Sequence, residues 1–197
     1  RGGRGGDGPL CLDQMLKSAL HEMLTELRTR CPNLQPAVLP AGFDDSEGGT
    51  ALLGLCRSAA ERERVAALLM RARSRRNACA LTGKSASPEE LRFVSQWELL
   101  PESGTLRLRE CSFVCEDARC LLDPLSLLER FTSPDADATE LGALADIFCR
   151  ANGRAELCAS PARALEWLQQ CVSLAYACRV AASSFPSWRV LDAEQLA

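Results

Sequence analysis

The spacing of apolar residues changes in the middle of this chain. Over most of its 197 residues apolar side chains recur every three or four positions, whereas between Phe93 and Cys115 they alternate with polar ones. The first period predicts amphipathic helices and the second predicts β-strands. We therefore expect a mainly α-helical, bundle-like fold with one β-hairpin at about residues 93–115. An aromatic content of only 5% agrees with Ala- and Leu-rich helix packing.

One register of the hairpin satisfies both of its faces. With a turn at residues 101–104, apolar side chains meet apolar ones on one face, and arginines meet acidic or amide side chains on the other. The expected pairs are Leu100–Thr105, Leu99–Leu106, Glu98–Arg107, Trp97–Leu108 and Gln96–Arg109. Past Glu110 the apolar phase slips, which predicts a bulge or corner near this residue. The alternative is that residues 93–100 extend the preceding helix.

Capping and breaking signals locate the helices. Ser-x-x-Glu and Asp-x-x-Glu patterns begin some of them, and prolines begin or end others. The expected helices cover about residues 9–31, 50–57, 58–76, 123–133, 137–152 and 160–183, with a further short helix starting at Ser87. Residues 32–49 hold three prolines and should form a loop that Val38, Leu39 and Phe43 pin to the core.

Composition suggests the domain boundaries. Residues 1–8 (RGGRGGDG) form a Gly-rich leader that we expect to be flexible. Residues 9–183 form the helical domain, either as a single unit or as two packed helical halves joined through residues 93–122. Residues 184–197 form a tail whose aromatic side chains should dock rather than remain in water. Because the chain begins at Arg1 and not at Met, we interpret it as a segment of a larger protein or as a processed product.

Eleven cysteines and a single histidine limit the chemistry. The cysteine count is odd and the spacing irregular, so we interpret the cysteines as reduced thiols of an intracellular protein, cytoplasmic or nuclear. Cys111, Cys115 and Cys120 come closest to a zinc motif, but the C-x2-C spacing typical of structural zinc sites is missing. They are weak candidates, and we expect neither a metal nor a cofactor.

A non-catalytic role is the function that the sequence favours. His21 has no sequence-local partner for nucleophilic catalysis, and the paired acidic residues occupy turn or cap positions. We expect a protein-protein interaction or scaffold domain whose partner presents an acidic surface. The candidate partner-binding residues are Arg71, Arg73, Arg75, Arg76, Phe185 and Trp188.

Nucleic acid is the alternative partner, with a structural zinc site. Against it, the chain has a net charge of -3, and aromatic residues for base stacking are missing near the arginine cluster. The sequence has no apolar run long enough to cross a bilayer, so we expect no membrane partner.

Overall fold

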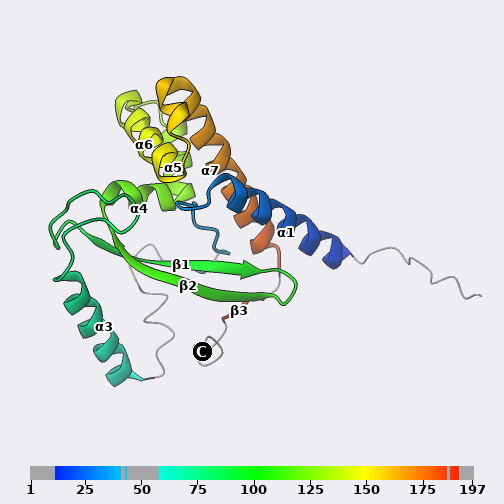
Figure 1. Ribbon diagram of the computed structural model, residues 1–197. Helices are drawn as coiled ribbons and strands as arrows, with labels where there is room; N and C mark the ends of the chain where they lie inside the picture. The colour runs from blue at the N-terminus through cyan, green and yellow to red at the C-terminus, as the bar shows by residue number, and fades with distance from the viewer. Residues whose placement is uncertain (1–11, 41–42, 44–57, 186, 191–197) are drawn as a thin grey trace, which may run out of the picture.

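The structure is a computed structural model that describes residues 12–40, 43, 58–185 and 187–190. It confirms a mainly α-helical fold with one β-hairpin (Figure 1). In chain order the elements are α1 (Leu12–Arg30), α3 (Ala59–Arg73), β1 (Arg92–Leu100), β2 (Thr105–Val114), α4 (Glu116–Leu122), α5 (Pro124–Thr132), α6 (Ala138–Ala151), the 3-10 helix η1 (Ala155–Ala159), α7 (Pro161–Ser183) and β3 (Arg189–Val190).

The main apolar core forms around α7. Helices α1, α5 and α6 all pack against α7, and the sheet lies beneath them (Figure 1). Leu27, Phe148 and Leu168 are fully buried in this core, and the rings of Phe148 and Trp167 lie 5.0 Å apart between centroids. Burial of each such side chain contributes about 1.5–3 kcal/mol, so these contacts hold the helices together.

Side-chain caps begin two of these helices. Asp123 and Asp137 are the N-cap residues of α5 and α6, and each carboxylate accepts from the backbone amides two and three residues further on, at 2.8 to 3.4 Å. After α6, Gly153 adopts a φ of 70°, a conformation that costs glycine little. The sequence signals at these positions are therefore confirmed.

The hairpin has the expected register near its turn. Leu100 pairs with Thr105, Leu99 with Leu106, Glu98 with Arg107, and Trp97 with Leu108, in antiparallel strands. The expected pair of Gln96 with Arg109 is wrong, because Gln96 pairs with Glu110. Arg109 is thus an extra residue, and the bulge lies one position before the expected corner. The extra residue puts Phe113 on the same face of the sheet as Leu106. The bulge therefore keeps these apolar side chains of β2 on one face.

Glu98 joins the hairpin to α1. Its carboxylate pairs with Arg107 across the strands and also with the Arg28 guanidinium, 3.1 Å away. The Glu98 side chain is only 17% exposed, so the three residues form a partly buried cluster rather than a solvated cross-strand pair.

This cluster predicts the result of exchanging its two strand residues. The double variant Glu98→Arg and Arg107→Glu keeps the cross-strand pair but places a second guanidinium beside Arg28. We expect a loss of about 1–2 kcal/mol in the free energy of unfolding, measured by urea denaturation, because like charges then meet at a partly buried site. In an Arg28→Ala background the same exchange should cost under about 1 kcal/mol. An equal cost in both backgrounds would contradict the role given to Arg28.

Two expected helices and one unexpected helix require comment. The backbone amide of Ser87 donates to Glu90 at 2.7 Å, as in a capping box, yet the chain makes only one turn before β1 begins at Arg92. The short helix expected at Ser87 is therefore wrong, because the strand takes up the chain too soon. Helix α4, by contrast, was not expected. The helix expected at residues 50–57 lies outside the described residues, as do the leader and most of the tail.

A helix that crosses a membrane must be both long and apolar. Within the part of the chain that the structure describes, every helix is too short or too polar to cross a bilayer.

Candidate functional site

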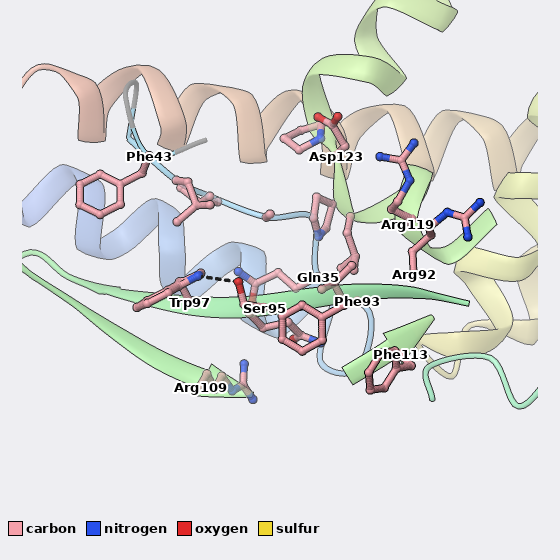
Figure 2. Close-up of a pocket in the computed structure, with 18 of the residues that line it drawn as sticks. Gln35, Phe43, Arg92, Phe93, Ser95, Trp97, Arg109, Phe113, Arg119 and Asp123 are labelled. Carbon is pink, nitrogen blue, oxygen red and sulfur yellow. Dashed lines mark hydrogen bonds between the residues drawn. The ribbon is translucent and has the colours of Figure 1, made fainter. Parts of the chain in front are cut away.

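A groove of about 740 Å³ opens between the sheet and the elements around it. One wall is the extended segment 35–39 together with Phe43, and residues from the C-terminal half of α3 also line the groove. The floor is β1, and the start of α4 and α5 closes one end. Figure 2 shows lining side chains from the segment that holds Gln35 and Phe43, from the two strands of the hairpin, and from Arg119 and Asp123.

The floor of the groove is apolar and aromatic. Residues 93, 95 and 97 share one face of β1, because side chains alternate along a strand. Phe93 packs edge-on against Phe113 at 5.5 Å between centroids, and the Trp97 indole N–H donates to the Ser95 hydroxyl at 2.9 Å (Figure 2). Trp97 packs against the main core but is only half-buried, and it also lines the groove.

Arginines surround this apolar floor. Five of them line the groove, against two carboxylates, in a chain whose net charge is -3. The five are Arg73, Arg92, Arg109, Arg119 and Arg179. They come from α3, β1, β2, α4 and α7, so the fold brings together charges that lie far apart in the sequence.

The two carboxylates are already engaged. Glu116 pairs with Arg119 at 2.6 Å, and this guanidinium lowers the pKa of the Glu116 carboxyl. Asp123 caps α5. Arg109 and Arg179 make no ion pair with any described residue, so the groove has a local excess of positive charge.

Hydrogen bonds hold the wall at residues 35–39 in place. The Ala37 amide donates to the Leu122 carbonyl at 2.7 Å, and Val38 and Leu39 are buried. The expectation that this loop is pinned to the core by Val38, Leu39 and Phe43 is confirmed. One wall of the groove is therefore preorganised.

The structure separates the four arginines of the sequence-predicted cluster. Arg73 turns inward, where its guanidinium donates to the carbonyls of Pro88 and Glu89 at 2.5 and 2.7 Å and lines the groove. Arg71, Arg75 and Arg76 are exposed and do not line it. Arg73 thus fixes the turn that leads into β1, whereas the other three remain candidates for a separate surface.

Phe185 and Trp188 pack against the main core. Their rings meet edge-on at 5.4 Å, and the Trp188 indole N–H donates to the Ala182 carbonyl at 2.7 Å. Both side chains are half-buried, so each presents only part of its surface for a partner.

The three cysteines of the weak zinc motif lie in different surroundings. Cys111 is exposed on β2, Cys115 contacts Thr82, and Cys120 lies within 3.8 Å of Glu116 and Arg130. Among the described residues, no three histidine, cysteine or acidic side chains are placed to hold a metal ion together. His21 is exposed beside Glu102 at the hairpin turn.

Sequence reasoning missed the groove itself. The sequence predicts Arg109 opposite Gln96. Its pattern does not distinguish Arg179 from the other residues of the last helix. The alternation of Phe93, Ser95 and Trp97 was a signal for one strand face, but it did not show what would lie opposite.

Comparisons with protein-family models, curated proteins and solved structures gave no significant match to this chain.

Proposed function

We propose that this chain is a non-catalytic, intracellular protein-interaction domain that binds an acidic, partly apolar segment of a partner protein in the groove. The observation that carries the proposal is the aromatic floor bordered by five arginines, two of which, Arg109 and Arg179, make no ion pair with a described residue. An aromatic and apolar centre with charged groups at its edge is the usual composition of a protein-binding site.

The chemistry of the groove indicates the chemistry of its partner. Arginine forms paired hydrogen bonds with carboxylates, and Arg109 and Arg179 supply such donors from β2 and α7. A ligand that reaches both must extend between two elements of a groove whose lining also includes the apolar surface of Trp97. A peptide with carboxylates flanking apolar side chains meets both requirements.

Charge reversal at the groove tests this proposal. The double variant Arg109→Glu and Arg179→Glu should weaken partner affinity by about 30- to 100-fold, because attraction becomes repulsion at two contacts. Stability should change by less than about 1 kcal/mol, since both sites lie at the surface of the groove. Partners captured from nuclease-treated lysate by wild-type protein are identified first, and their affinities are then measured by titration at low and high salt.

A matched control lies on the surface outside the groove. Reversal of Arg75 and Arg76 makes the same change in net charge but leaves the groove lining intact. It should leave the affinity within about twofold. If it abolishes binding while the groove variant still binds, the exposed arginine surface is the binding site and the groove is not. If nuclease treatment removes the partner, the alternative of a nucleic-acid-associated domain is correct.

A further inference from the structure

Cys79 and Cys115 lie together beneath a surface turn. Residues 78 and 85 form a β-bridge, the Cys79 amide donates to the Lys84 carbonyl at 2.8 Å, and Gly83 closes the turn with a φ of 70°. A backbone bond of 2.9 Å from Ala80 to Phe113 ties this turn to the end of β2. The backbone therefore fixes the position of one thiol relative to the other.

The two sulfur atoms share polar neighbours. The Thr82 hydroxyl lies 3.8 Å from the Cys115 sulfur, and it lowers the pKa of the Cys79 thiol. Cys79 and Cys115 belong to the same small buried cluster, together with Leu91, Phe113 and Val114. Cys79 is 2% exposed and Cys115 is 6% exposed, yet Ala80 and Lys84 of the covering turn are exposed, so the pair lies one turn below the surface.

These neighbours favour a thiolate at Cys79. Burial raises the pKa of the Cys79 thiol, but hydrogen bonds from the Thr82 hydroxyl and from the backbone amides of Cys115, Thr82 and Leu81 outweigh burial, and the pKa falls below its usual value. Burial raises the pKa of Cys115, and its contact with Cys79 adds to this effect. The pKa shifts of the two thiols therefore run in opposite directions, and Cys79 is the member of the pair that loses its proton more readily.

Other neighbouring cysteines lie in different surroundings. Cys31 and Cys171 also contact each other, and this contact raises the pKa of Cys31 and lowers that of Cys171, but both residues are buried in the main core. Cys149 lies near Cys158, and burial raises its pKa to about 12. Neither pair has the set of backbone amide donors that surrounds Cys79.

We propose that Cys79 and Cys115 form a dithiol site that hydrogen peroxide oxidises to a disulfide. The Cys79 thiolate attacks one peroxide oxygen, the O–O bond breaks, and the departing hydroxide is protonated to water, which leaves a sulfenic acid on Cys79. Cys115 then attacks this sulfur, the S–O bond breaks, and a second water departs with the Cys115 proton. The two thiols lose two electrons, and the peroxide gains them.

Peptide mapping tests the proposal on the wild-type chain. After peroxide treatment and blocking of the remaining thiols, trypsin should release residues 77–84 linked to residues 110–119, with fragmentation locating the link at Cys115. The second peptide also contains Cys111, which is exposed and serves as an internal control. Oxidation directed by exposure alone would consume Cys111 and leave Cys79 and Cys115 reduced, and that result would overturn the proposal.

Two further measurements exclude a cross-link formed after unfolding. The oxidised protein should melt about 5–10 °C higher than the reduced protein, and dithiothreitol should reverse the gain, because the link constrains the unfolded chain. In the Cys115→Ser variant, a sulfenic-acid trap such as dimedone should label Cys79 and no disulfide should form. If the melting temperature falls on oxidation, or the trap labels Cys111 instead, the site is not the one proposed.

Discussion

Replacement of Asn152 by alanine should lower the free energy of unfolding by about 3–5 kcal/mol. Asn152 is 4% exposed, and its side-chain oxygen accepts from the backbone amides of Asn33 and Leu34 at 3.1 and 2.9 Å. Its side-chain nitrogen donates to the carbonyls of Leu34 and Phe148 at 3.0 and 3.2 Å. Alanine would leave both backbone groups of buried Leu34 without a partner, and each such group costs about 1–3 kcal/mol.

The neighbouring Asn33 provides the control. Its side chain donates to the Ala151 carbonyl at 2.9 Å across the same junction, but Asn33 is exposed and water can replace it. Asn33→Ala should therefore cost under about 1 kcal/mol in urea denaturation. Similar losses for the two variants would show that the buried amide does not hold the junction. Residues 35–39 continue from this junction into the groove wall. The partner affinity of a groove variant should therefore be compared with that of the wild type only if the variant remains folded.

The parts of the fold that sequence analysis predicted depend on local interactions. The hairpin register follows from pairs such as Leu99 with Leu106 and Glu98 with Arg107, which lie within ten residues of each other. Helix starts follow from Asp123 and Asp137, whose carboxylates bind amides in the next turn. A short turn or a cap restricts the chain so closely that the residue types themselves indicate the structure.

The groove depends on contacts that sequence spacing does not record. Arg109 takes its position from a bulge, and Arg179 reaches the groove from the last helix. The sequence groups Arg73 with three other arginines because all four fall within residues 71–76, yet Arg73 turns inward to the carbonyls of the turn before β1. Periodicity predicts which face of an element is apolar, but it does not predict which element will cover that face.

Helix α4 was missed for a related reason. It has only seven residues, and four of these are buried, so its sequence (EDARCLL) has too few positions to establish a helical period. It nevertheless supplies the carbonyl of Leu122 that holds the groove wall and the Arg119 side chain at the rim. Short elements of this kind form because the surrounding core requires them, and their own propensity is a weak guide.

Ending the chain at Ser184 should lower the free energy of unfolding by about 3–5 kcal/mol. The deletion removes the contacts of Phe185 and Trp188 with the main core and the hydrogen bond from Trp188 to Ala182. It also removes β3, which runs parallel to β2 and pairs Val190 with Leu106 beside the hairpin turn. Loss of two half-buried aromatic rings and several hydrogen bonds accounts for a cost of this size.

A chain that ends at Val190 is the matched control, because it retains every contact of residues 185–190 that the structure describes. Urea denaturation of the two shortened proteins should therefore separate docking of the tail from a general effect of shortening. The same truncations also test the proposed function, because neither Phe185 nor Trp188 lines the groove. Partner affinity should survive in any truncated protein that remains folded, whereas loss of binding with unchanged stability would show that the tail aromatics contact the partner directly.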